Sequence, residues 1–173
     1  MSESTKAEPK VRSVKQISMR EHAKKRSMWA GSKAMQKTEY PLLFIEESGE
    51  KVFRPAEVKY PPVLLKIIDE IIVNAIDHHV LNPTLVKEIK ISIDEVGMIT
   101  VYNNGPGIHV ALTKNLSGVE MYTVQLIFGE FMAGSNFDDT EDRIVGGQNG
   151  IGSKLTVVYS DIFTVETLDS TTD

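Results

Sequence analysis

The sequence predicts an α+β fold with helices on one face of a mostly antiparallel sheet. One observation is a long apolar segment, residues 61–81, which begins with two prolines as helices often do. Another is a pair of strand candidates, 88–93 and 98–102, separated by a glycine-containing turn of hairpin length. The third is the order helix, strand, strand, helix, loop, helix, strand, which is typical of this class.

The first part of the chain contains a tail, a short helix and a small hairpin. Residues 1–13 are polar and predict a disordered basic tail, so the expected domain covers residues 14–173. Ser18 and Glu21 have the spacing of a capping box, which predicts a helix to about Lys25, and Gly31 interrupts helical structure. Residues 42–45 and 51–53, joined by Glu-Ser-Gly-Glu, predict a hairpin.

The later elements follow the long helix, which Asn82-Pro83 should end. Residues 121–131 predict a second apolar helix. The polar, glycine-rich residues 132–149 are long enough to be a functional loop. A further helix should begin at about Gly152, and residues 162–167 predict a closing strand.

The composition is that of a globular domain and excludes several kinds of site. Of the 173 residues, 41% are hydrophobic, none is cysteine and no run of eighteen apolar residues occurs, so no membrane span or thiolate zinc site is expected. Residues 1–37 hold ten of the 19 Lys and Arg residues but only three acidic ones, whereas the remainder holds 21 acidic residues. The basic arm is either a solvated end or a nucleic-acid contact.

Three polar groups share one stripe of the long helix. Glu70, Asn74 and Asp77 are spaced i, i+4 and i+7 among Leu, Ile and Val residues. Burying such groups without partners costs several kcal/mol, so a metal, a water or a ligand is one explanation. The other is that the stripe faces solvent, as the polar face of an amphipathic helix does. The spacing alone leaves both open.

Two glycine-containing segments are candidate ligand loops. Asn103-Asn104-Gly105-Pro106-Gly107 follows a predicted strand, and Asn103 has donors and an acceptor for a heterocycle edge; an ordinary turn is the alternative. Residues 146–154, GGQNGIGSK, continue into a helix and predict a phosphate cradle of backbone N–H groups, with a flexible surface loop as the alternative. The second segment is neither a Walker A loop nor a dinucleotide fingerprint.

Together, these segments resemble the Bergerat-type (GHKL) ATP-binding fold. The words LLKIIDEIIVNAIDH, VYNNGPGI, LIFGEFMAGSNFDD, GGQNGIGSK and FTVET are similar to the N-terminal ATPase domain of type IIA DNA topoisomerases of the eukaryotic and large-DNA-virus kind. The segment EHAKKRSMWAGS stands where that family has its N-terminal strap, at about residues 14–37, with Trp29 as a packing anchor. The resemblance covers residue 14 to the end and implies a helix-covered, mostly antiparallel mixed sheet.

The resemblance also implies roles for single residues. Glu70 falls on the catalytic glutamate that activates or orients water, an effect typically worth ~10²–10⁴ in rate. Asn74 falls on the Mg²⁺ ligand, Asp77 on a polar neighbour of the nucleotide and Asn103 on the residue that contacts the adenine edge. The remaining implied ATP-binding residues are Gly105, Gly107, Ser135, Asn136, Gly147, Gln148, Asn149, Gly150, Ile151, Gly152, Ser153 and Lys154. Lys154 would pair with phosphate oxygens.

The cofactors implied are ATP and Mg²⁺, and the partners are a second copy of the chain in a closing ATPase gate and DNA held by other domains. An intracellular location follows, either the nucleus or a viral replication site in the cytoplasm. The alternative function is a nucleotide-binding module with little turnover, because the family's transducer lysine and DNA-cleaving tyrosine lie outside these residues. GGQNGIGSK and FTVET disfavour a mismatch-repair or kinase ATPase. An inert, basic-armed DNA-binding module would instead bind DNA in a salt-dependent way.

Overall fold

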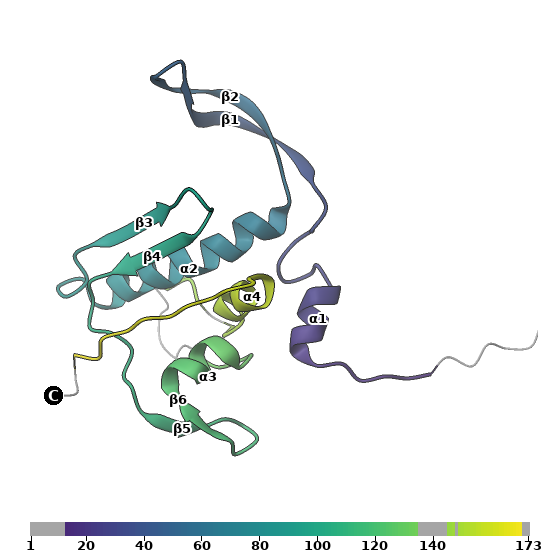
Figure 1. The fold of residues 1–173 in the computed structure, drawn as a ribbon, viewed down its shortest axis with the longest axis vertical. Coiled ribbons are helices and arrows are strands. Elements are labelled where there is room, and N and C mark those ends of the chain that lie inside the picture. Colours follow the sequence, from purple (N-terminus) through teal and green to yellow (C-terminus); the bar gives the residue numbers. More distant parts are fainter. Residues whose placement is uncertain (1–12, 135–144, 148, 171–173) are drawn as a thin grey trace, which may run out of the picture.

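The computed structural model describes residues 13–134, 145–147 and 149–170. The expected tail therefore lies outside the described residues except for Ser13. Figure 1 shows the order of the elements. They are α1 (Met19–Lys25), β1 (Gln36–Glu47), β2 (Glu50–Tyr60), α2 (Pro62–Leu81), β3 (Ile89–Ile93), β4 (Ile99–Asn103), β5 (Leu112–Lys114), β6 (Glu120–Tyr122), α3 (Thr123–Gly129) and α4 (Gly152–Tyr159).

The short first helix is confirmed with its predicted cap. The Glu21 backbone N–H donates to Ser18 Oγ at 3.2 Å, and α1 ends at Lys25. Gly31 has a φ of +85°, a conformation that glycine adopts without the steric cost of a side chain. The helix and the turn after it therefore have local causes that the sequence contains.

Both predicted hairpins form, and the first is longer than expected. β1 and β2 extend to Gln36 and Tyr60, pair antiparallel, and project from the rest of the molecule (Figure 1). The Phe44 and Phe53 rings contact each other across the pair, with centroids 5.1 Å apart and planes tilted by 53°. In the second hairpin, Ile89 of β3 pairs with Asn103 of β4. This register places Asn103 at the end of β4, where the predicted ligand loop begins.

A third hairpin, β5–β6, is missing from the prediction. Each strand has three residues, and Asn115 closes the turn because its Oδ1 accepts from the N–H groups of Ser117 and Val119, both at 3.0 Å. The predicted helix over 121–131 is correspondingly too long. Met121 pairs with Thr113 in the hairpin, so α3 begins only at Thr123.

The predicted closing strand over residues 162–167 is wrong. Within the described part of the chain, this segment joins none of the three strand pairs. Side chains fix it instead: Thr167 Oγ1 accepts from Ile108 N–H at 2.8 Å, and Asp169 Oδ2 accepts from Val110 N–H at 2.9 Å. Apolar alternation predicts extended backbone, but a strand also needs a backbone ladder with a neighbour.

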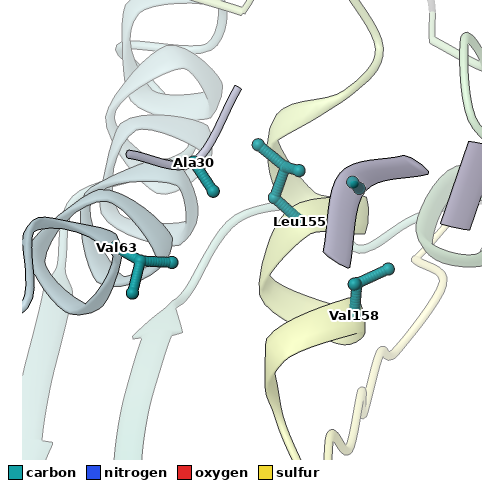
Figure 2. Packing of buried hydrophobic residues seen from close by; sticks show 5 residues of the cluster. Ala30, Val63, Leu155 and Val158 are labelled. Atoms are coloured by element: carbon teal, nitrogen blue, oxygen red, sulfur yellow. The ribbon is translucent and has the colours of Figure 1, made fainter. Parts of the chain in front are cut away.

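The core lies where α1, α2 and α4 meet. It consists of small and branched apolar side chains, and Leu155 of α4 is only 2% exposed. Figure 2 shows the close packing of these side chains. The members are Ala23, Ala30, Val63, Leu155 and Val158. Two long-range hydrogen bonds join the same helices: Thr156 Oγ1 donates to Ile67 O and Tyr159 Oη to Ala23 O, both at 2.8 Å.

The segment expected to be the strap packs within its own chain. Trp29 lies against Phe131, with ring centroids 6.1 Å apart, and α1 contributes Ala23 to the core. Trp29 is therefore a packing anchor, as predicted.

The α+β class with antiparallel strands is confirmed, and the strands of the described residues form three separate two-stranded ladders. No helix among the described residues has the length and apolar character needed to cross a membrane.

Candidate functional site

The stripe on α2 is covered at two of its three positions. The Glu70 side chain is 21% exposed, forms an ion pair with Lys66, and lies under the start of α4. Asp77 is half-buried, whereas Asn74 between them is exposed. The stripe therefore does not simply face solvent, because Gly146, Gly147 and Gly152 lie against these two carboxylates.

Asp77 holds the glycine-rich segment by two hydrogen bonds. The N–H of Gly146 donates to Asp77 Oδ1 and that of Gly147 to Asp77 Oδ2, both at 2.8 Å. Hydrogen bonds from backbone N–H groups to a carboxylate are charge-assisted and stronger than those between neutral groups. The two glycines therefore form an anion-binding pair, and the anion that they bind in this structure is Asp77.

The start of α4 lies directly on Glu70. A Cβ at Gly152 would stand 2.6 Å from Glu70 Cδ, so a larger residue would force the Glu70 carboxyl group to move. Gly150, with a φ of +56°, turns the chain into the helix, and its carbonyl accepts from Met132 N–H at 3.0 Å. The N-terminal end of a helix favours negative charge, which suits both the Glu70 carboxylate and a phosphate.

Lys154 is buried against a carbonyl. The residue is only 3% exposed, and Nζ donates to Ala133 O. Burial lowers the pKa of the Lys154 ammonium to about 8, because desolvation disfavours the charged form. A phosphate reached by Lys154 would supply a countercharge, which none of the residues that the structure describes provides.

The other predicted residues of this loop divide into two groups. Ser153 is buried and its Oγ donates to Ile127 O at 3.4 Å, while Ile151 packs against the core. Asn149 is exposed. Ser135, Asn136 and Gln148, which the sequence also assigns to the nucleotide, lie outside the described residues.

Asn103 meets α2 at the other end of the stripe. Asn103 Oδ1 lies 3.0 Å from His78 Nδ1 and accepts from Gly105 N–H at 3.1 Å. A Cβ at Gly105 would stand 2.5 Å from His78 Cε1, so glycine is needed for this contact. The neighbouring Asn104 Oδ1 accepts from the N–H groups of Lys87 and Glu88 and fixes the loop. The segment is therefore a turn bound to α2.

Gly107 packs on the C-terminal segment. A Cβ there would stand 2.6 Å from the carbonyl carbon of Leu168 and 2.6 Å from Thr167 Oγ1. Asp169, with its side chain 4% exposed, also lies 3.0 Å from His109 Nδ1. Sequence reasoning misses Thr167 and Asp169, since it treats FTVET as a strand. It misses His78 as well, although this residue directly follows Asp77.

The structure brings several of the predicted residues together around α2. The glycine-rich segment contacts Glu70 and Asp77, and the Asn103 loop contacts His78 one residue further on. An open cavity of about 490 Å³ lies elsewhere and includes, of the residues discussed, Val110 and Thr167. Among the described residues, no group of three His, Asp or Glu side chains forms a metal cluster. This arrangement offers anion-binding N–H groups at one end and an amide at the other.

Comparison with known families gives one match over most of the chain. Residues 60–165 match the family described as histidine kinase-, DNA gyrase B-, and HSP90-like ATPase. The matched region begins at the end of β2 and includes α2, the Asn103 loop and α4. It therefore contains every described residue of the candidate site except those after residue 165.

The individual relatives of this chain belong to a more specific class of protein than the family as a whole. DNA topoisomerase 2 of Penicillium chrysogenum is 44% identical over 134 residues, 77% of this chain and 8% of that protein. DNA topoisomerase 2 of Acanthamoeba polyphaga mimivirus is 43% identical over 133 residues, 74% of this chain and 10% of that protein. The chain thus spans about a tenth of the length of these relatives.

Solved structures agree with these sequence matches. The ATPase region of Saccharomyces cerevisiae topoisomerase II superposes with a TM-score of 0.71 and 35% identity, over 83% of this chain and 36% of that one. The ATPase and transducer domains of DNA topoisomerase II from Balamuthia mandrillaris give a TM-score of 0.72 and 34% identity, over 85% and 36%. The fold is therefore that of a topoisomerase II ATPase region.

Proposed function

We propose that this chain, which belongs to the histidine kinase-, DNA gyrase B-, and HSP90-like ATPase family, binds Mg-ATP as part of a type II DNA topoisomerase. The family match and the GHKL fold support nucleotide binding. The relatives support the topoisomerase. In the proposed whole protein, other domains would hold DNA and two copies of this chain would form a closing gate. That protein would act inside the cell.

The observation that carries this proposal is the convergence of two glycine segments on α2. Gly146 and Gly147 present N–H groups at Asp77, Gly152 covers Glu70, and the Asn103 loop meets His78. Phosphate oxygens accept hydrogen bonds from backbone N–H groups, and the edge of a base forms hydrogen bonds with a side-chain amide. A nucleotide lying along α2 would be able to contact both kinds of group, because both lie against this one helix.

In this arrangement, Glu70 is the group that would activate or orient the water molecule that attacks the phosphate. Its carboxylate is held by Lys66 and lies beside the start of α4, where phosphate would bind. A positioned carboxylate can accept a proton from water or orient it. The ion pair with Lys66 fixes the side chain on the α2 surface, so Lys66 is a positioning residue for Glu70.

Asn74 suits the role of the single protein ligand of Mg²⁺. Its amide is exposed between Glu70 and Asp77, and a Cβ on Gly147 would stand 3.8 Å from Asn74 Oδ1. Mg²⁺ commonly takes one or two protein oxygens and completes its shell with phosphate oxygens and water. When bound, the ion would neutralise charge on the phosphates.

A nucleotide-binding module with little turnover is the alternative for this chain alone. Transition-state charge needs preorganised donors and cations, and Lys154 is bound to Ala133 O in this structure. Measuring binding and hydrolysis separately distinguishes the two functions.

Calorimetric titration of the 173-residue chain with a non-hydrolysable ATP analogue and Mg²⁺ tests the proposal. We expect weak saturable binding, reduced when Mg²⁺ is removed or when Asn74 is changed to Ala, and little phosphate release from ATP itself. Folded protein that gives no binding heat at millimolar analogue would overturn the nucleotide site.

A further inference from the structure

The C-terminal segment reverses the usual pattern of burial. Leu168 is 85% exposed, whereas the next residue, Asp169, has a carboxylate side chain that is only 4% exposed. A buried charge costs free energy unless hydrogen bonds compensate it, and an exposed leucine contributes little to a core. The hydrogen bonds of Asp169 therefore fix this part of the chain more than apolar packing does.

Two side chains of this segment hold another segment in register. Thr167 Oγ1 accepts from Ile108 N–H at 2.8 Å, and Asp169 Oδ2 accepts from Val110 N–H at 2.9 Å. Each bond joins residues 59 positions apart, so alternate residues of one segment bind alternate residues of the other, with the period of extended chain. Side-chain oxygens thus take the place that strand carbonyls have in a parallel ladder.

The segment held in this way is the loop that follows Asn103. Residues 104–111 form no helix or strand. At the start of this loop, Asn104 Oδ1 accepts from two backbone N–H groups. Further along, a Cβ at Gly107 would stand 2.6 Å from the carbonyl carbon of Leu168. The C-terminal segment therefore determines the path of the second half of the loop, as Asn104 determines its start.

We propose that Asp169 and Thr167 are positioning residues of the nucleotide site, which hold the loop 104–111 in the conformation that receives the base. A loop without secondary structure has many conformations, and ordering it at the moment of binding lowers affinity. Bonds that order the loop beforehand remove this loss from the binding step. This inference rests on the proposed nucleotide function and adds two residues that lie outside both glycine segments.

A ligand without a base separates positioning from general stability. If Asp169 acts through the loop 104–111, it should matter for a ligand with a base and not for inorganic tripolyphosphate, which would bind at Gly146 and Gly147. Amide resonances of the isotope-labelled full chain, titrated with Mg²⁺ and either tripolyphosphate or a non-hydrolysable ATP analogue, measure both affinities. A general loss of folding would weaken the binding of both ligands equally.

We expect Asp169→Ala to weaken binding of the ATP analogue about three- to tenfold, the effect of losing one hydrogen bond. Its affinity for tripolyphosphate should stay within about twofold of the parent, because distant sites without shared partners act independently. Asp169→Asn keeps a side-chain oxygen that can accept from Val110 N–H, so it should retain most of the affinity. Thr167→Val, which lacks only the hydroxyl acceptor, should act in the same direction as Asp169→Ala.

Glu166→Ala is the matched control. Glu166 also carries a carboxylate in this segment, but it is exposed and lines the open cavity beside Val110. The variant removes the same charge as Asp169→Ala and should leave both affinities within about twofold of the parent. Chemical denaturation confirms that each variant is folded.

Hydrogen exchange of the ligand-free chain tests the contacts themselves. Asp169→Ala should speed the exchange of Val110 N–H about five- to tenfold, and Thr167→Val should do the same to Ile108 N–H, while Glu166→Ala changes neither. Exchange of Val110 N–H at the parent rate in Asp169→Ala would show that the carboxylate does not hold the loop and would overturn the proposal.

The binding results overturn the proposal in two further ways. Folded Asp169→Ala that binds the ATP analogue as tightly as the parent would do so, and so would equal losses for the analogue and for tripolyphosphate. In both cases the parent still binds nucleotide, so the proposed function stands and only the positioning role is removed. A parent chain that binds neither ligand would instead remove the proposed function together with this inference.

Discussion

The two halves of the candidate site hold their glycine segments by different physical means. At one, carboxylates on α2 hold three described glycines, through N–H bonds from Gly146 and Gly147 to Asp77 and the packing of Gly152 on Glu70. At the other, neutral groups hold the Asn103 loop, through His78 and Gly105. A phosphate would compete with Asp77 for the N–H groups of Gly146 and Gly147, whereas a base need not displace the contact between His78 and Asn103. The first half should therefore rearrange on binding and the second should not.

The largest expected effect is at Glu70 in the carboxylate half. In a longer protein that hydrolyses ATP, Glu70→Gln should lower turnover by ~10²–10⁴ and leave nucleotide binding in place. Phosphate release and calorimetric binding measure the two quantities. Glu88→Gln is the control, because Glu88 also pairs with a lysine, Lys90 at 2.9 Å, but lies outside the site. Undiminished turnover by Glu70→Gln would remove the role given to this residue.

The next largest effect is the loss of folding stability when alanine replaces a glycine that lies against another part of the chain. Gly152→Ala should destabilise the fold by about 1–3 kcal/mol, because its Cβ would overlap the Glu70 carboxyl group. Gly107→Ala should cost more than Gly152→Ala, since its Cβ would meet the Leu168 backbone, which cannot rotate away. Chemical denaturation measures the free energy of unfolding. Gly129→Ala is the control, with no atom within 4 Å of the added Cβ; a loss there equal to that at Gly107 would contradict these contacts.

Much of the fold could be predicted because its causes are local. The Ser18 cap, the turn at Gly97 and the helix after Pro61 each depend on neighbours in sequence. The three-residue strands β5 and β6 are too short for a pattern to reveal. Residues 162–167 have the alternation of a strand, but this segment is fixed instead where the side chains of Thr167 and the nearby Asp169 accept from backbone N–H groups.

The site could be predicted in part for the same reason. The spacing of Glu70, Asn74 and Asp77 places them on one stripe of α2 whatever surrounds the helix. The bonds from Gly146 to Asp77 and from His78 to Asn103 join residues 69 and 25 positions apart. Spacing in sequence contains no information about such pairs. Apart from its position directly after Asp77, nothing in the sequence indicates that His78 belongs to the site.

A smaller effect is expected at Asp77 itself. Asp77→Asn replaces charge-assisted bonds to Gly146 and Gly147 with at most one neutral bond, a loss of about 1 kcal/mol. Hydrogen exchange of these two amides should become about five- to tenfold faster. Asp69→Asn, an exposed position on the same helix, should leave both rates unchanged. Unchanged exchange in Asp77→Asn would show that the carboxylate does not hold the loop.

The smallest effect concerns pH and Lys154. Burial lowers the pKa of Lys154 to about 8 from 10.5 in an unfolded chain, so between these values the unfolded state binds more protons. The free energy of unfolding should therefore rise as pH increases from about 8, and Lys154→Met should remove this slope.

Denaturation between pH 7.5 and 9.5 measures it, and the comparison with Lys154→Met removes the opposite contribution of Tyr40 and Tyr159, whose pKa values are raised by folding. Because phosphate favours the charged ammonium, affinity for the ATP analogue should fall over the same interval. A stability that decreases in the parent from pH 8 to 9.5, and does so equally in Lys154→Met, would contradict the burial of a charged Lys154.

Titration of the isotope-labelled chain with Mg²⁺ and a non-hydrolysable ATP analogue, followed by amide resonances, is the sharpest test of a nucleotide site along α2. We expect large shifts at Gly146 and Gly147, where phosphate replaces Asp77, and smaller shifts at Gly105. The β1–β2 hairpin, which projects from the body, should not respond (Figure 1). Shifts confined to that hairpin or to the cavity beside Val110, with none at Gly146 and Gly147, would contradict this site.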